Sequence, residues 1–133
     1  MSDRDQEIIN RLRRSYEAFN RADFDAAMEI AHPEIEFVPP GGGSALRGSD
    51  AMRAWMEPDA LEEQRFELRD IRVNGNKALV YQHSSARGSG SGIEVEVNLW
   101  TVWTFSDDHF VTRLESFLMH EEGRALEAAG LSE

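Results

Sequence analysis

Two residues in strand-like segments, Glu36 and His83, are the candidates for moving a proton in a binding pocket. General acid–base catalysis needs a titratable group held in a low-dielectric site beside its substrate. Glu36 shares a face of a short strand with Val38, because residues two apart in a strand point to the same side. His83 shares a face of a longer strand with Tyr81, and we expect this face to lie towards Phe66. Each also has a structural alternative: a solvated strand carboxylate for Glu36, and a hydrogen-bonded structural or surface histidine for His83.

Two hydroxyl residues, Thr101 and Ser116, interrupt an apolar stripe and could hydrogen-bond a ligand, although backbone groups or water are equally suitable partners. The chain contains no cysteine, which excludes disulfides, thiolate metal ligands and a cysteine nucleophile. Its four histidines lack metal-ligand spacing, and its glycine-rich segment 41–44 lacks the lysine of a phosphate-binding loop. We therefore expect no metal and no cofactor.

The size and charge of the chain narrow the classes of function. Its 133 residues suit one hydrophobic core, so we expect a single domain over residues 1–133. The 14 basic and 25 acidic residues give a formal charge of −11, which repels nucleic acid and anionic membranes. The polar first residues predict no signal peptide, and no later run is long enough to span a membrane. The expected location is the cytoplasm, and the expected partner is a small hydrophobic molecule.

The spacing of apolar residues predicts helices at both ends of the chain and strands between them. The expected order begins with a helix over residues 5–21, with Asp3 as its N-cap, and a short helix that Asp23 caps and His32-Pro33 ends. A strand over residues 34–38 and a helix from residue 49 follow. Four strands between about 64 and 119 and a helix over residues 120–129 complete the order. Apolar pairs out of phase on either side of Asp70 predict a β-bulge, and Asn74-Gly75 predicts a hairpin. The expected fold is α+β, with a curved antiparallel sheet and packed helices around an apolar pocket.

The last two strands are expected to pair through a symmetric turn about Asp107-Asp108, with Thr101 opposite Leu114. One face of this pair is apolar and predicts a pocket wall. The expected pocket residues, from this face and from other strands and helices, are Tyr16, Phe19, Val38, Trp55, Leu99, Thr101, Trp103, Leu114, Ser116 and Leu118. The other face is mixed and too apolar to be simply solvated. It predicts a homodimer surface formed by Trp100, Val102, Arg113, Glu115 and Phe117.

Five short motifs carry a family resemblance that covers nearly the whole chain. They are YEAFNRADF (16–24), HPEIEF (32–37), LRG (46–48), WTFSD (103–107) and ALEAAGL (125–131). Their order resembles the nuclear-transport-factor-2-like superfamily, and its SnoaL-like branch in particular. The resemblance implies a curved mixed, mostly antiparallel sheet that wraps around a long N-terminal helix as a cone. It also implies a pocket inside the cone and dimers packed sheet to sheet.

The acid–base groups of better-understood relatives have no matching acid in this chain. The carboxylate base and the second pocket acid of steroid-isomerase-like members match Val38 and Thr101, and their helix-one tyrosine matches Ser15. The aspartate of SnoaL-type cyclases and of epoxide-hydrolase-like members matches Ser116. The resemblance therefore implies a fold and a pocket without transferring any of these activities.

Three functions remain open. The first is a small-molecule-binding protein with an apolar pocket. The second is a cofactor-independent isomerase, cyclase or hydrolase-type enzyme that uses Glu36 or His83 on a small hydrophobic substrate. The third is an interaction module that uses the sheet face around Trp100. A pocket with Glu36 or His83 inside favours the enzyme, whereas an open apolar pocket with hydroxyl groups as its polar members favours binding.

Overall fold

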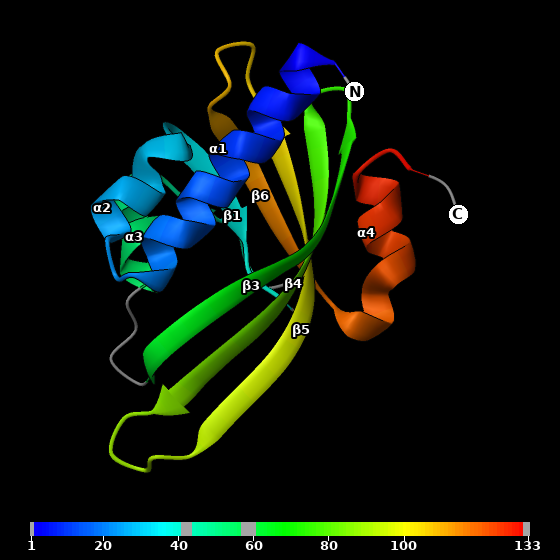
Figure 1. The fold of residues 1–133 in the computed structure, drawn as a ribbon. Helices are drawn as coiled ribbons and strands as arrows, with labels where there is room; N and C mark the ends of the chain where they lie inside the picture. The colour runs from blue at the N-terminus through cyan, green and yellow to red at the C-terminus, as the bar shows by residue number, and fades with distance from the viewer. Residues whose placement is uncertain (1, 41–43, 57–60, 132–133) are drawn as a thin grey trace.

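A computed structural model describes residues 2–40, 44–56 and 61–131 of the chain. Six strands form one curved sheet in the order β2-β1-β6-β5-β4-β3, in which β1 and β6 run parallel and the other neighbours are antiparallel. Helices α1, α2 and α3 lie on one side of the sheet, and α4 lies on the other side (Figure 1). This is the α+β fold that the sequence predicts, with a sheet that curves without closing. The predicted loop at residues 41–43 and the helix end at Pro58 lie outside the described residues.

α1 (Asp3–Asn20) is the long helix around which the sheet curves. Ser2, rather than the expected Asp3, is its N-cap, because the Ser2 side chain accepts a hydrogen bond at 3.1 Å from a backbone N–H of the first turn. The apolar positions predicted at three- and four-residue spacing are buried against the rest of the inner core: Ile8, Leu12, Tyr16 and Phe19. The amphipathic pattern therefore predicts this element and its buried face correctly.

The second helix is shorter than expected, and a strand follows it directly. α2 (Phe24–Ala27) is capped by Asp23, as predicted, through a 3.2 Å hydrogen bond from Ala26 N. The chain then makes a single 3-10 turn, η1 (Met28–Ile30), and enters β1 (Ala31–Val38). The prediction that His32-Pro33 ends a helix is wrong, since both residues lie within β1. Pro33 is accommodated there because the pairing of β1 with β6 is interrupted between Ala31 and Glu36.

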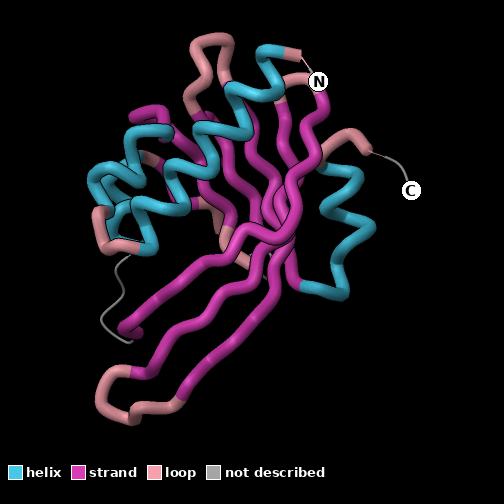
Figure 2. Tube along the Cα trace, in the orientation of Figure 1, coloured by secondary structure: helices cyan, strands magenta, loops and turns pink. Residues whose placement is uncertain are grey.

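Three long antiparallel strands follow the short β2 (Leu46–Arg47) and α3 (Ser49–Met56): β3 (Leu61–Asn74), β4 (Lys77–Gly88) and β5 (Glu94–Phe105). The predicted bulge is confirmed by a register shift between Leu68 and Asp70. The Asn74-Gly75 hairpin is also confirmed, with Gly75 at a φ of 62° that favours glycine. The free ends of these strands, residues 61–65, 84–88 and 94–98, extend beyond the helices, and we call them the arm (Figure 2).

β6 (Val111–Leu118) pairs with β5 in a register two residues away from the predicted one. Thr101 lies opposite Ser116, where the sequence analysis expects Leu114. The turn is longer than a symmetric two-residue turn because it includes His109 at a φ of 66° and a bulge before Phe105. An offset of two residues keeps side chains on the same face of a strand. The predicted pocket-facing side of this hairpin is therefore correct although its register is wrong.

Two apolar clusters occupy the two faces of the sheet. The inner cluster joins α1, α2 and α3 to the strands. On the outer face, η2 (Met119–Glu121) leads into α4 (Glu122–Ala128), which takes part in a second cluster: Leu79, Trp100, Val102, Phe117, Ala125, Leu126 and Ala129. Three of the predicted dimer residues, Trp100, Val102 and Phe117, are therefore buried beneath α4 within one protomer. The apolar character of this face is explained by α4, which the sequence analysis did not place there.

Candidate functional site

Two neighbouring pockets, the inner and the outer chamber, lie between α1, α3 and the inner face of the sheet. The inner chamber, of about 60 Å³, is lined by Tyr16, Phe19, Phe37, Met52, Trp55, Met56, Phe66, Gln82, Leu99, Thr101, Trp103, Leu114 and Ser116. The outer chamber, of about 680 Å³, is lined by Pro40, Leu46, Ala51, Ala54, Trp55, Leu61, Gln64, Phe66, Ser84, Ser85, Ala86, Val95, Val97, Leu99 and Leu118. Trp55, Phe66 and Leu99 line both chambers, so the two adjoin, and we call them together the cavity.

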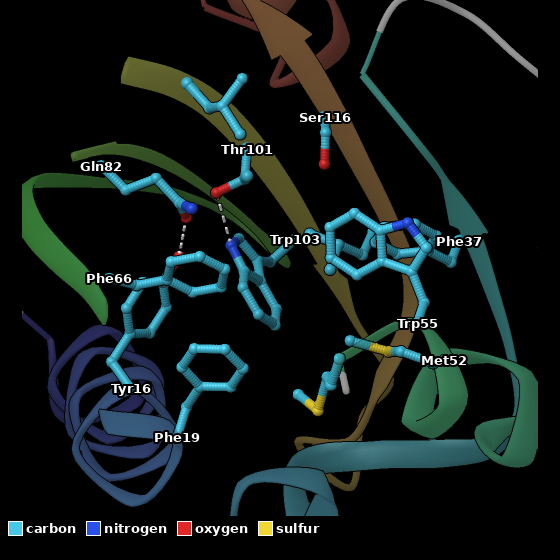
Figure 3. A pocket seen from close by; sticks show the side chains of 13 residues that line it. Tyr16, Phe19, Phe37, Met52, Trp55, Phe66, Gln82, Thr101, Trp103 and Ser116 are labelled. Carbon is cyan, nitrogen blue, oxygen red and sulfur yellow. Dashed lines mark hydrogen bonds between the residues drawn. The ribbon is translucent and has the colours of Figure 1, made fainter. Parts of the chain in front are cut away.

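Tyr16 brings one polar group from α1 into the inner chamber. Its hydroxyl donates a hydrogen bond to the side-chain oxygen of Gln82 (Figure 3). Gln82 Nε2 donates in turn to Ser84 Oγ at 3.1 Å. Burial removes the hydroxyl from water and raises the pKa of Tyr16 above its ordinary value. Tyr16 is therefore a neutral hydrogen-bond donor at physiological pH, and its donation is already used by Gln82.

We expect Tyr16 to stay protonated in the folded protein at a pH where an unfolded tyrosine ionises. In Tyr81→Phe, Tyr16 is the single remaining tyrosine, so phenolate absorbance reports on it alone. The absorbance should not rise through about pH 10, the ordinary tyrosine value. Because the native state then holds a proton that the unfolded state releases, the free energy of unfolding should fall as the pH rises above that value. A phenolate transition centred near pH 10 in the folded variant would contradict the buried environment.

Thr101 and Ser116 add two hydroxyl groups from paired positions of β5 and β6. Trp103 Nε1 donates a hydrogen bond to Thr101 Oγ1 at 2.9 Å, which fixes the indole ring at the chamber wall (Figure 3). The Thr101 hydroxyl also interacts with the Tyr16 hydroxyl, since it lowers the pKa that burial raises. The Ser116 side chain makes no hydrogen bond with another described residue, so its hydroxyl is available to a ligand. The inner chamber thus offers neutral hydrogen-bonding groups in an apolar surrounding.

Asn20, in the last turn of α1, fixes the edge of the cavity next to β3. Its side-chain nitrogen donates to Phe66 O at 2.8 Å, and its side-chain oxygen accepts from Phe66 N at 2.8 Å. β3 is an edge strand, so this amide satisfies backbone groups that have no neighbouring strand. The Phe66 ring is stacked on Phe19 with centroids 4.3 Å apart. Asn20 therefore positions a wall residue that belongs to both chambers.

Most of the predicted pocket residues line the cavity. Eight of them line the inner chamber: Tyr16, Phe19, Trp55, Leu99, Thr101, Trp103, Leu114 and Ser116. Leu118 lines the outer chamber. The prediction for Val38 is wrong by one strand position, because Phe37 is buried and faces the cavity, whereas Val38 does not line it. Ser15, the match for a helix-one tyrosine, points elsewhere and donates to the Ala27 carbonyl at 2.8 Å.

Glu36 lies on the side of β1 opposite to the cavity, so the expectation that it faces the pocket is wrong. Its carboxylate accepts a hydrogen bond from Arg113 and lies 3.3 Å from Arg47. Arg113 Nε also contacts Glu115 at 3.1 Å, and this carboxylate is the main cause of a raised pKa of the guanidinium. The cluster ties β1 to its neighbours on both sides. It includes Arg113 and Glu115, the two predicted dimer residues that stay partly exposed.

His83 also lies outside the cavity, on the outer side of β4, and the expectation that it faces Phe66 is wrong. Its ring nitrogens lie 2.6 Å from Asn98 Oδ1 and 3.3 Å from Glu96 Oε1. The hydrogen bond with Asn98 is the main cause of a raised pKa of His83, and Glu96 adds to it. Gln82, the preceding residue, occupies the inward position instead.

Gln82 in the inner chamber, and Gln64, Ser84 and Ser85 in the outer one, are polar cavity residues that were not predicted from the sequence. The inward position of Gln82 follows from the Gly88–Gly92 turn, where Gly88 N donates to Ile93 O at 2.9 Å. A register counted back from this contact places Gln82 opposite Leu99, and hence inside the sheet. The apolar residues Phe37, Met52 and Met56 were also not predicted as wall residues. The sequence shows only that each is a large apolar residue in a helix or strand that packs on the core.

Within residues 2–40, 44–56 and 61–131, no group of three or more His, Cys, Asp or Glu side chains could hold a metal ion. None of the helices in those ranges is long and apolar enough to cross a membrane. Among the described residues that line the cavity, Tyr16 is the single titratable one. The chemistry of the site is therefore that of an apolar cavity with neutral polar groups.

Solved structures of other proteins share this fold. SalBIII, an epoxide hydrolase/cyclase-like enzyme in pyran ring formation of the polyether salinomycin, superposes with a TM-score of 0.79 at 18% identity, over 89% of this chain and 94% of that chain. An NTF2-like protein of unknown function from Burkholderia pseudomallei gives 0.75 at 21% identity, over 94% and 98%. A Mycobacterium tuberculosis protein in complex with estradiol-17beta-hemisuccinate gives 0.73 at 12% identity, over 82% and 91%. These similarities show a common fold.

Sequence comparison identifies the family. No curated protein matches the chain. The profile of the SnoaL-like domain, in contrast, matches residues 12–113 of the 133, from within α1 to the start of β6. This range includes the second half of the long helix and most of the curved sheet that surround the cavity. The chain therefore belongs to the SnoaL-like domain family.

Proposed function

We propose that the protein binds a small hydrophobic molecule in the cavity between α1, α3 and the arm. The proposal is carried by the outer chamber, which has a volume of about 680 Å³ and mainly apolar walls. Ligand sites in proteins typically have volumes of about 300–1,000 Å³, apolar walls and a few placed polar groups. Gln64, Ser84 and Ser85 are the polar residues of this chamber, and Thr101, Ser116 and Gln82 are those of the adjoining inner chamber. The complex of the M. tuberculosis relative with estradiol-17beta-hemisuccinate supports a ligand of this type.

An enzyme acting on such a molecule is the second candidate, because SalBIII is an epoxide hydrolase/cyclase-like enzyme. Isomerases and cyclases move protons, and they need a group that titrates near neutral pH beside the substrate. Glu36 and His83 face away from the cavity, and burial keeps Tyr16 protonated. The cavity wall therefore supports binding better than proton transfer.

An interaction module on the outer sheet face is less well supported. Trp100, Val102 and Phe117, on which that hypothesis depends, are covered by α4. A homodimer on this side of the sheet would therefore bury α4 itself, together with the partly exposed Arg113 and Glu115. We therefore propose a homodimer in which α4, Arg113 and Glu115 form the contact.

A titration with the uncharged dye N-phenyl-1-naphthylamine, which fluoresces in apolar surroundings, tests the binding function. We expect saturable binding at one site per chain. Val97→Asp places a carboxylate in the outer chamber, and Val97 is 41% exposed, so the fold should tolerate it. The dye should then bind about fivefold more weakly, because about 1 kcal/mol of apolar contact is lost.

Asn98→Asp is the matched control for this titration. It adds the same charge to β5 one residue along, on the face that contacts His83 rather than the cavity. Dye binding to this variant should equal that of the wild type. Absence of saturable binding to the wild type would contradict the proposed function, and equal weakening by both variants would place the dye elsewhere.

A further inference from the structure

An apolar stripe on β5 continues from the cavity to the end of the arm. Val97 and Val95 line the outer chamber, yet they are 41% and 46% exposed. Ile93, which lies just before β5, continues the alternation and is 65% exposed. Glu94 and Glu96, which lie between them, take part in ion pairs with Arg87 and His83. The stripe is therefore one face of a strand that no described helix covers (Figure 1).

The walls around this stripe are also apolar. Leu61 of β3, Ala86 of β4 and Trp55 of α3 line the same chamber, and Ala86 lies directly opposite Val95. None of the described residues that line the outer chamber carries a charge. Exposed apolar surface of this kind marks an interaction site. Because Val95 is part of both the cavity wall and the stripe, one ligand can occupy both.

The stripe has a definite length. Leu99, which lines both chambers, is six residues from Ile93, and strand geometry places them about 20 Å apart. An extended chain of single bonds advances about 1.2 Å per bond, as a polypeptide does with three bonds in about 3.6 Å. The stripe therefore matches an extended chain of about sixteen atoms.

We infer that the ligand is an uncharged long-chain molecule whose aliphatic chain lies along Val97, Val95 and Ile93. The inference rests on the proposed binding function and specifies its ligand class. The inner chamber, at about 60 Å³, holds only a small leading group such as a hydroxyl or carbonyl, beside Thr101 and Ser116. A charged group there would lose its hydration without gaining an ion partner. A second copy of the chain is the rival occupant, and the charge of −11 on each copy opposes it.

Competition between the dye and a homologous series of 1-alkanols, from hexanol to hexadecanol, tests whether the aliphatic chain of a ligand lies along the stripe. In the wild type, the dissociation constant should fall about fourfold for each methylene that is buried, and this gain should continue at least to tetradecanol. In Val97→Asp and in Val95→Asp the gain should stop at a defined chain length. The two lengths should differ by about five to six carbons, since residues two apart on a strand are separated by about 6.7 Å. Asn98→Asp should behave as the wild type.

Each other outcome has a separate meaning. A gain that ends before decanol in the wild type, or variants that weaken every alkanol equally, overturns the long-chain ligand while leaving dye binding and the proposed function intact. A wild type that does not bind the dye overturns both. Sedimentation velocity completes the test: a wild-type dimer that Val95→Asp converts to a monomer assigns the stripe to a second copy and overturns the inference.

Discussion

Replacing Trp103 by alanine should lower the free energy of unfolding by about 3–5 kcal/mol and weaken binding of the dye. Trp103 is 5% exposed, its ring centroid lies 6.0 Å from that of Tyr16, and its Nε1 donates to Thr101. The truncation leaves a void at the wall of the inner chamber, and the void can collapse only in part because β5 is held by strands on both sides. The same void removes the surface that a ligand contacts.

Urea denaturation of the wild type, Trp103→Ala and Trp103→Phe measures this effect. Phenylalanine retains most of the ring and loses the hydrogen bond to Thr101, so it should cost about 1–2 kcal/mol. A loss below about 1 kcal/mol for the alanine variant would show that Trp103 does not pack as described, since a fully buried tryptophan costs more.

Replacing Ala125 by arginine should lower the free energy of unfolding by about 3–5 kcal/mol, because it buries a long side chain with an unpaired charge. Ala125 is 0% exposed and lies in the outer cluster with Trp100 and Val102. The structure can relieve the clash only by displacing α4 from the sheet. Displacement would expose Trp100 and Phe117, so we expect a red shift of tryptophan emission and concentration-dependent association.

Glu127→Arg is the control for this substitution. Glu127 is an exposed residue of the same helix, so arginine there should change the stability by less than about 0.5 kcal/mol. Thermal unfolding, emission spectra and size-exclusion chromatography of the two variants make the comparison. Native stability in Ala125→Arg would contradict the packing of α4 on the sheet.

The elements with strong periodicity could be predicted from the sequence. The apolar spacing predicts α1, the out-of-phase strand pairs predict the bulge before Asp70, and Asn74-Gly75 predicts the hairpin. The wall formed by Thr101 and Trp103 was also predicted correctly, despite a turn that is longer than expected. This error did not matter because side chains alternate with a period of two, and the register error was also two.

The two catalytic candidates were misplaced for different physical reasons. In β1, Ile35 and Phe37 alternate with charged residues, and this alternation correctly places Phe37 inside. The family comparison favoured Val38 instead, and Glu36 with it. In β4 the residues around His83 gave no clear alternation, because apolar clusters cover both faces of that strand. Only pairing with β5, counted from the Gly88–Gly92 turn, places Gln82 inside.

Alternate residues of β5 line the cavity and pack against α4, and this restricts which changes in sequence the strand can tolerate. Leu99, Thr101 and Trp103 face the cavity, whereas Trp100 and Val102 face α4. Substitutions at the first set can adapt the cavity to a new ligand without disturbing the helix. Deletion of a single residue within the strand would exchange the two sets, and would place side chains shaped for α4 in the cavity. Changes in chain length should therefore accumulate in the turns that flank β5, while the strand itself keeps a constant length.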